Sequence, residues 1–166
     1  MGGWWTVAFA AAHPERVASV TLSDTPGGIF TPAMESHWAT WRQGGGLAKP
    51  GAIGRHPGIS ATLAERDINL AFLYEQLGSF HEPPLAAVGK ALGEARFPAA
   101  ALTVLAVPLL VVAGTQDQIF PHDLLADLAR ELGAAFVSIE GCGHSPYFEH
   151  AAVYNEAILR FLAGAG

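Results

Sequence analysis

Residues 108–147 read PLLVVAGTQDQIFPHDLLADLARELGAAFVSIEGCGHSPY, and this stretch decides the fold. It holds two short apolar runs, residues 109–113 and 135–139, and between them a segment, residues 122–132, whose leucines recur at helical spacing. Short apolar runs of this kind are typical of strands buried in a parallel sheet. Because strands and helices alternate here, the stretch predicts a strand–helix–strand unit of an α/β fold.

One candidate catalytic side chain follows each of the two strands. Asp117 comes three residues after Gly114, where the first run stops, and His144 lies in the loop after the second run. Parallel strands end at the same edge of a sheet, so the acid and the imidazole can meet there. An aspartate that accepts a hydrogen bond from one ring nitrogen leaves the other free to take a proton from a nucleophile. Taken alone, Asp117 is typical of a turn or cap residue, and His144 of a histidine in a loop. Because each follows one of two successive strands, we favour the interpretation that they form a pair.

The segments at the two ends of the chain continue the same alternation of helices and strands. Residues 2–12 are apolar on nearly every side and stop at a His–Pro pair, which predicts a buried helix. Residues 16–24 are rich in β-branched side chains and end in the turn sequence TPGG, which predicts a strand. A final helix is predicted over residues 151–162. The whole chain, residues 1–166, is therefore predicted to form one α/β unit around a three-stranded parallel sheet.

The middle of the chain, residues 27–100, has a different sequence pattern from the segments before and after it. Glycine and proline pairs punctuate it, and no alternating strand pattern appears. One of its helical patterns, residues 60–77, places on one face Leu63, Ala64, Ile68, Ala71 and Phe72. Helices are predicted over residues 32–43, 60–77 and 84–95. We interpret this region as a helical cap inserted between two α/β units, with a separate small helical domain as the alternative.

Composition and charge narrow the function classes. The chain is 51% hydrophobic and 14% charged, which suits a buried core and argues against disorder. Its net charge of −6, without a block of like charge, makes nucleic acid and anionic membrane surfaces poor partners. No apolar run reaches the roughly 18–20 residues of a membrane span. The one cysteine, Cys142, excludes an internal disulfide and fits a cytoplasmic location. Its spacing from His144 and His150 matches no familiar zinc site, so we expect neither a metal nor a cofactor.

These motifs resemble those of the α/β-hydrolase superfamily. In that fold a strand runs into the turn G-x-S-x-G, and a helix follows at once. If a serine stood directly before Met1, Gly2 would be the last glycine of the motif, required because a Cβ there would crowd the tight turn. The sequence PERV at residues 14–17 and the strand after it look like the family's next step. Residues 114–121 and 141–146 are similar to its acid segment and its histidine loop.

The resemblance implies a role for each site residue. Asp117 would be the acid and His144 the base of a Ser–Asp–His triad, and the backbone N–H of Met1 would be an oxyanion donor. The serine and a second oxyanion donor would lie upstream. Ser145 directly follows His144 and is expected to point elsewhere. Ser23 and Asp24 end the first strand near the active-site edge, but neither stands in an elbow motif that would replace the serine. We therefore expect the chain to be the C-terminal portion of a hydrolase that lacks its nucleophile and is inactive as given.

The resemblance also implies a class of substrate. Family members hydrolyse ester, lactone or amide bonds, or a carbon–carbon bond beside a ketone. The apolar cap favours a small hydrophobic acyl-type substrate, for which Trp38, Trp41 and Phe72 are candidate pocket residues, unless they belong to the core of the cap. Glu149 is interpreted as starting or capping the last helix.

A non-catalytic binding module or fragment built on hydrolase parts is the alternative. Without upstream strands, the predicted strand at residues 16–24 exposes a sheet edge with unpaired backbone groups. This edge predicts self-association, or pairing with a separately encoded N-terminal half.

Overall fold

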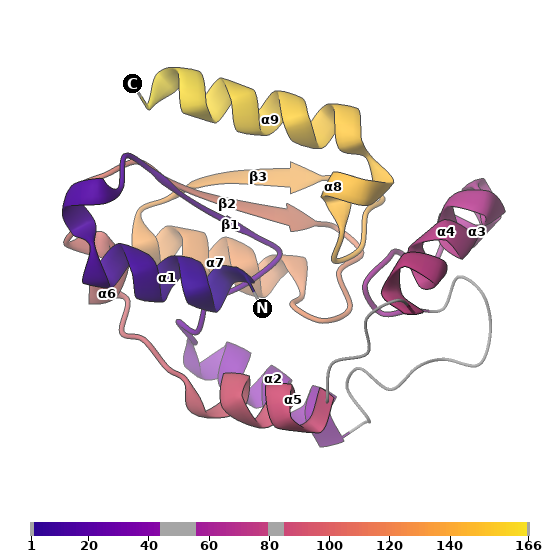
Figure 1. Ribbon diagram of the computed structural model, residues 1–166, viewed down its shortest axis with the longest axis horizontal. Coiled ribbons are helices and arrows are strands. Elements are labelled where there is room, and N and C mark those ends of the chain that lie inside the picture. The colour runs from indigo at the N-terminus through magenta and orange to yellow at the C-terminus, as the bar shows by residue number, and fades with distance from the viewer. Residues whose placement is uncertain (1, 44–55, 80–84, 166) are drawn as a thin grey trace.

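A three-stranded parallel sheet forms the centre of the molecule (Figure 1). We analysed a computed structural model that describes residues 2–43, 56–79 and 85–165. Within these residues the strand order is β1 (Val20–Ser23), β2 (Leu109–Gly114) and β3 (Ala135–Ile139). The predicted sheet is thus confirmed, and β2 and β3 match their predicted ranges within one residue.

The first strand is shorter than predicted. It begins at Val20, four residues later than predicted, because a 3₁₀ turn, η1 (Pro14–Arg16), begins at the proline of the His–Pro pair. Proline at the start of that turn fixes its φ angle, and the N–H of Val17 donates to the carbonyl of Pro14. The segment joins the sheet only where the N–H of Val20 donates to the carbonyl of Pro108.

Helices cover both faces of the sheet (Figure 1). On one face lie α1 (Gly2–Ala12) and α7 (His122–Leu132), and on the other lies α9 (Ala151–Gly164). Successive side chains of β2 alternate between the faces, as a strand requires. Val111 and Ala113 belong to the main core with α1 and α7, whereas Leu110 and Val112 pack toward α9.

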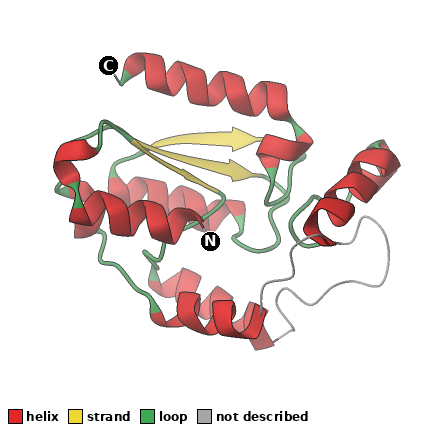
Figure 2. Cartoon of the chain, viewed as in Figure 1, coloured by secondary structure: helices red, strands yellow, loops and turns green. Residues whose placement is uncertain are grey.

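The region predicted as a cap lies between β1 and β2, and the regular secondary structure of its described residues is helical, with loops between the helices (Figure 2). Its elements are α2 (Pro32–Gln43), α3 (Leu63–Arg66), α4 (Ile68–Ser79), α5 (Leu85–Glu94) and α6 (Ala100–Thr103). The predicted helices over residues 32–43 and 84–95 are confirmed. The indole N–H of Trp4 in α1 donates to the carbonyl of Ala95, which ties the end of the insertion to the α/β core.

The helix predicted over residues 60–77 is two helices, α3 and α4. The break falls at Asp67, whose backbone is extended and whose side-chain oxygen accepts from the N–H of Leu70 at 3.0 Å. An aspartate that caps the next helix competes with continuous helix formation. The predicted face is therefore confirmed only in part: Leu63 and Ala71 are buried, whereas Ile68 and Phe72 are exposed.

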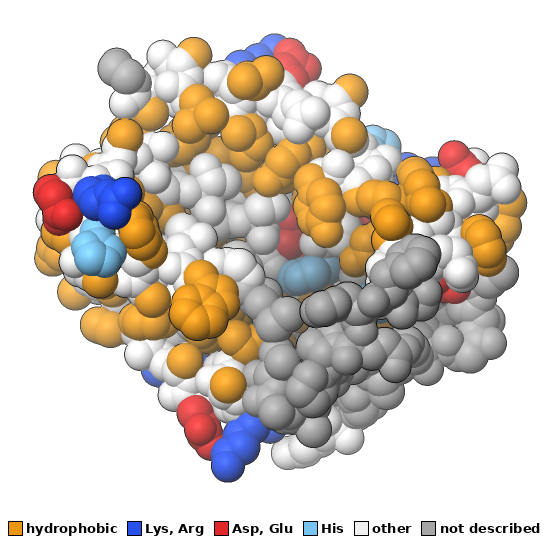
Figure 3. Space-filling view, in the orientation of Figure 1, with side chains coloured by type: hydrophobic (Ala, Val, Ile, Leu, Met, Phe, Trp, Pro, Cys, Tyr) orange, Lys and Arg blue, Asp and Glu red, His pale blue; other side chains and the backbone are white. Residues whose placement is uncertain are grey.

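The first helix is not buried on all sides. Trp4 and Val7 enter the core, but Trp5 is 76% exposed and Phe9 is also exposed. Figure 3 shows hydrophobic side chains gathered on the face that carries α1, α4 and α9. A short helix that the sequence did not predict, α8 (Pro146–Glu149), follows the histidine loop. None of the helices in the described part of the chain has the length and apolarity that a membrane crossing requires.

Gly114, at the end of β2, tests the contact between the two loops that follow β2 and β3. A Cβ at Gly114 would lie 2.2 Å from the carbonyl oxygen of Gly143, a backbone atom that cannot rotate away. We expect Gly114→Ala to lower the free energy of unfolding by roughly 2–3 kcal/mol, measured by urea denaturation of the 166-residue chain. Gly164→Ala is the control, because a Cβ there meets nothing within 4 Å. Equal stability of the two variants would contradict the close approach.

Candidate active site

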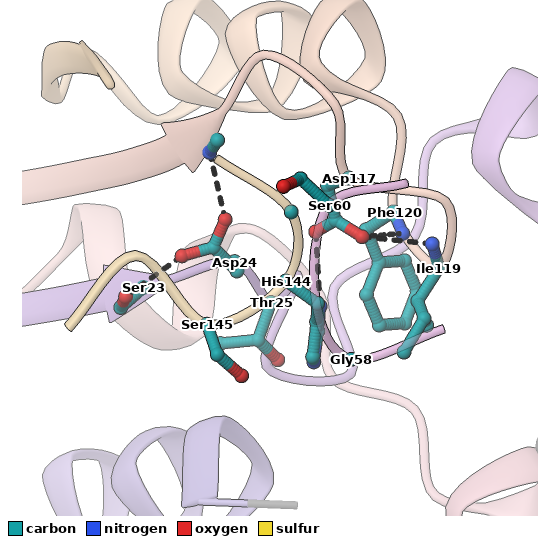
Figure 4. A network of polar contacts seen from close by, with 12 residues as sticks. Ser23, Asp24, Thr25, Gly58, Ser60, Asp117, Ile119, Phe120, His144 and Ser145 are labelled. Atoms are coloured by element: carbon teal, nitrogen blue, oxygen red, sulfur yellow. Dashed lines mark hydrogen bonds and ion pairs between the residues drawn. The ribbon is translucent and has the colours of Figure 1, made fainter. Parts of the chain in front are cut away.

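Asp117 and His144 meet at the carboxyl edge of the sheet (Figure 4). Asp117 lies in the loop after β2, and His144 lies in the loop after β3. The Nδ1 atom of His144 is 2.9 Å from Oδ2 of Asp117. The strand positions predicted this meeting, because β2 and β3 are parallel neighbours whose loops leave the same edge.

The second oxygen of Asp117 fixes the direction of the carboxylate. Oδ1 accepts from the backbone N–H of Ile119 at 2.7 Å and from that of Phe120 at 3.1 Å. The side chain has no exposed surface. Hydrogen bonds from two N–H groups stabilise the charged form of the buried carboxylate and aim Oδ2 at the imidazole.

The geometry of His144 leaves one ring nitrogen available. Because Asp117 can only accept when ionised, Nδ1 carries the proton that lies between them, and the neutral ring presents a lone pair at Nε2. Among the described residues, no hydrogen-bond partner of Nε2 is found. The His144 side chain is partly exposed, and the Phe120 ring lies 6.0 Å from it, centroid to centroid. The pair is thus arranged as a base with its orienting acid.

The two loops are joined through their backbones. The N–H of Gln116 donates to the carbonyl of Cys142 at 2.7 Å, and the N–H of Gly141 donates to Oγ1 of Thr115 at 2.9 Å. Together with the approach of Gly114 to Gly143, these contacts hold the acid and the base in one rigid frame.

A second buried acid, Asp24, ends β1 at the same edge. Its Oδ1 accepts from the N–H of Gly114 at 2.8 Å, and its Oδ2 accepts from the hydroxyl of Ser23 at 2.9 Å. Burial raises the pKa of Asp24 to about 7, against the lowering effect of the Gly114 hydrogen bond, and the nearby charge of Asp117 raises it further. Its backbone is left-handed, with φ of 53°. The sequence placed Asp24 at this edge but gave no signal for its burial.

The start of α1 lies at this edge as well, beside Thr25, which follows β1. A Cβ on Gly2 meets nothing within 4 Å among the described residues, but the turn in which Gly2 is expected to be required lies outside them, so that expectation stays a prediction. The crowded position is Gly3, where a Cβ would lie 2.5 Å from the Cγ2 methyl of Thr25. Met1, the predicted oxyanion donor, lies outside the described residues.

The three predicted pocket residues lie in different surroundings. Trp38 is 7% exposed and belongs to the main core, where it stacks on Trp41 at 5.1 Å and on Phe120 at 5.2 Å between centroids. Phe72 is 48% exposed and lies on α4. Trp38 therefore reaches the site through Phe120, the residue that lies between it and His144.

The fold and this acid–base pair at its carboxyl edge define an α/β hydrolase, and a comparison of families gives the same answer. Residues 1–157 match the family described as "Alpha/beta hydrolase family". The chain therefore belongs to the alpha/beta hydrolase family, which confirms the resemblance and the fold class inferred from the sequence.

Individual relatives cover nearly all of this chain. A pimeloyl-[acyl-carrier protein] methyl ester esterase of Xanthomonas campestris pv. campestris is 31% identical over 98% of this chain and 68% of its own length. A 2-hydroxy-6-oxononadienedioate/2-hydroxy-6-oxononatrienedioate hydrolase of Klebsiella pneumoniae is 30% identical over 99% of this chain and 60% of its own length. The solved structure of a thermophilic esterase from Thermogutta terrifontis, with malate bound, aligns with a TM-score of 0.74 and 25% identity, over 99% of this chain and 62% of that one. The chain thus spans roughly two thirds of the length of these relatives.

Asp24 predicts a dependence of stability on pH. The folded carboxyl holds its proton up to about pH 7, whereas the unfolded chain releases it near 4. Between these values the folded state binds more protons, so the free energy of unfolding falls as pH rises. Asp24→Asn cannot ionise, keeps an acceptor for the N–H of Gly114 and tolerates a left-handed backbone. Between pH 5 and pH 7.5, the free energy of unfolding of the variant should rise by roughly 3 kcal/mol relative to that of the unmodified chain, measured by urea denaturation.

The control for this measurement is Asp127→Asn, which changes an exposed aspartate that pairs with Arg130 on α7. Its stability relative to the unmodified chain should stay constant over the same pH range. An Asp24→Asn difference that does not change with pH would contradict the buried, protonated acid.

Proposed function

We propose that this chain supplies the acid and the base of a hydrolase that acts through a Ser–Asp–His triad on an ester, lactone, amide or carbon–carbon bond. The observation that carries the proposal is the 2.9 Å contact between His144 Nδ1 and Asp117 Oδ2 at the carboxyl edge of the sheet. The esterase and hydrolase relatives support the same reaction class.

The proposed reaction follows from the free nitrogen of the imidazole. His144 Nε2 takes the proton of a serine hydroxyl as the serine oxygen attacks the acyl carbon, and then gives it to the leaving group. Asp117 stays ionised and stabilises the imidazolium that forms between these steps. Water then attacks the acyl carbon while His144 Nε2 takes its proton, the bond between the acyl carbon and the serine oxygen breaks, and the serine oxygen takes the proton from the imidazolium, which regenerates the base.

The serines nearest the site are each engaged elsewhere, which supports a nucleophile from another part of the protein. Ser23 donates to Asp24, Ser60 donates to Glu149, and Ser145 shares a hydrogen bond with Tyr74. Among the described residues, none of these three hydroxyl groups is hydrogen-bonded to Nε2 of His144. We propose that the serine directly precedes Met1 in the full protein, because Gly3 packs on Thr25 and so brings the start of α1 to the catalytic edge.

The proposed substrate is a small hydrophobic acyl compound. Phe120, which contacts both Trp38 and His144, is the aromatic residue best situated to meet an acyl group held beside the base. Trp38, Trp41 and Phe72 remain proposed pocket residues, with Trp38 acting through Phe120. Because the two relatives' names cover different bonds, the substrate is proposed only at the level of this class. The single buried cysteine, Cys142, supports the proposed cytoplasmic location.

A second candidate function is that of a binding module, and one surface favours it. Within the described residues β1 pairs only with β2, so its other edge offers free backbone groups. A surface hollow beside this edge is lined partly by Trp5, Phe9 and Val17, and Trp5 is largely exposed. We propose that a second copy of this chain pairs here, through strand addition at the edge and burial of the aromatic side chains.

The catalytic proposal predicts activity only when the upstream serine is present. The 166-residue chain should hydrolyse p-nitrophenyl acetate at the background rate. A chain extended through the codons upstream of Met1, with an in-frame Gly-x-Ser, should be active, and His144→Ala or Asp117→Asn should lower its kcat by about 10³-fold or more. His13→Ala, an exposed histidine after α1, is the control and should have no effect.

Two results would contradict this prediction. Robust hydrolysis by the 166-residue chain that disappears in His144→Ala would mean that the nucleophile lies within it. An extended chain that contains the serine and turns over unchanged after His144→Ala would remove the imidazole from the mechanism.

The binding-module proposal predicts association that depends on Trp5. The mass of the 166-residue chain, measured by light scattering after gel filtration, should rise with concentration, and Trp5→Ser should shift the midpoint to a concentration about tenfold higher. Leu159→Ser is the matched control, because Leu159 is similarly exposed but lies on α9, across the sheet. A constant monomer mass, or equal effects of both variants, would exclude this surface.

A further inference from the structure

Glu149, the last residue of α8, has a carboxylate that is fully buried and fully engaged. Its Oε1 accepts from the N–H of Gly143 and from the N–H of Ser60, each at 2.8 Å. Its Oε2 accepts from the hydroxyl of Ser60 at 2.6 Å and from the guanidinium of Arg66 at 3.2 Å. Glu149 therefore joins three segments that are far apart in sequence: the histidine loop, α8 and the segment around α3.

This pattern is not that of a helix cap. The residue at the N-cap of α9 is His150, and among the described residues the Glu149 carboxylate is bound by Gly143, Ser60 and Arg66, so the interpretation of Glu149 as a cap of the last helix is wrong. All of its backbone donors come from Gly143 and Ser60, which lie 6 and 89 residues away. A buried carboxylate with four donors is stable only while every donor stays in place.

The segment around Ser60 touches the histidine loop backbone to backbone. A Cβ on Gly143 would lie 2.3 Å from the carbonyl carbon of Ile59 and 2.4 Å from the nitrogen of Ser60. No side chain fits between them. Gly143 directly precedes His144 in the chain, so the position of this contact fixes where the backbone of His144 begins.

The residue on the other side of His144 is held by the same region. The hydroxyl groups of Ser145 and Tyr74 lie 2.9 Å apart, and Tyr74 belongs to α4 of the insertion. Arg66 also donates to the carbonyl of Gly141 at 3.3 Å. Contacts from the insertion thus flank His144 on both sides, while Asp117 holds its ring from a third direction.

We propose that Glu149 is a positioning residue: its buried carboxylate fastens the inserted segment at residues 58–66 to the histidine loop and so sets the orientation of His144. The proposal rests on the proposed function only in taking His144 as the base. A substrate-induced movement of the insertion would be transmitted to the imidazole through Gly143. The cap and the base therefore act as one unit.

The test uses NMR of the 166-residue chain, which needs no nucleophile. Long-range ¹H–¹⁵N spectra of His144, recorded where the ring is neutral, report which nitrogen carries the proton. We expect the proton on Nδ1 in the unmodified chain and a mixture of tautomers in Glu149→Ala. The amides of Gly143 and Ser60 should exchange with solvent about tenfold faster in this variant, while amides of β2 and α7 stay unchanged.

Three further variants make the result decisive. Glu149→Gln keeps an acceptor for the two N–H groups but places an amide opposite Arg66, so an intermediate effect is expected. Ser60→Ala removes the hydroxyl that donates to Glu149 and accepts from Arg66, keeps the backbone N–H, and carries the test if Glu149→Ala does not fold. Glu156→Ala, which breaks an exposed ion pair with Arg160 on α9, is the matched control and should change nothing at His144.

The outcomes separate the two proposals. A proton on Nε2 of His144 in the unmodified chain, or no response of the ring to Asp117→Asn, would overturn the proposed acid–base pair. A proton on Nδ1 that stays there in Glu149→Ala and in Ser60→Ala would leave that pair intact and overturn the positioning role of Glu149. Faster amide exchange without a change at the ring would also overturn it, because Glu149 would then only stabilise the loop.

Discussion

The structure depends on the close approach of two loops, those that follow β2 and β3. Gly114 and Gly143 bring the backbones so near that a Cβ at Gly114 would overlap the carbonyl of Gly143. Parallel pairing of the two strands places both loops at one edge, and the hydrogen bond from Gln116 to Cys142 locks them together. The short contact between Asp117 and His144 is a consequence of this packing, because the two loop backbones hold the side chains within hydrogen-bonding distance.

Three buried carboxylates around this contact differ in how well they are satisfied, and the difference sets their chemistry. Asp117 receives two backbone N–H groups and the imidazole. Glu149 receives two backbone N–H groups, a hydroxyl and a guanidinium. Asp24 receives one N–H and one hydroxyl, and burial raises its pKa to about 7. Because donors offset the cost of burying charge, the small number of donors around Asp24 agrees with the raised pKa of this carboxyl.

The local sequence pattern predicted much of this arrangement, but it did not predict contacts between residues that are far apart in the sequence. Strand order and loop position sufficed for Asp117 and His144, and a left-handed glycine, Gly133, ends α7 where the spacing of leucines stops. The break at Asp67 between α3 and α4 escaped prediction, because a capping aspartate has no distinct mark inside an apolar helical pattern. Glu149 was misread for a different reason: its partner Ser60 lies 89 residues away, and no periodicity reports such a contact.

The insertion contacts both of the loops that carry the acid and the base. His37 on α2 lies 2.9 Å from the carbonyl oxygen of Ile119, and its neighbour Trp38 stacks on Phe120 in the acid loop. Ser60, further along the insertion, is bound through Glu149 to the histidine loop. Because the two loops also bind each other, a shift of the insertion would strain the acid–base contact from two sides. The inserted helices therefore help to hold the two loops, and their packing acts on the Asp117–His144 contact together with that of the sheet.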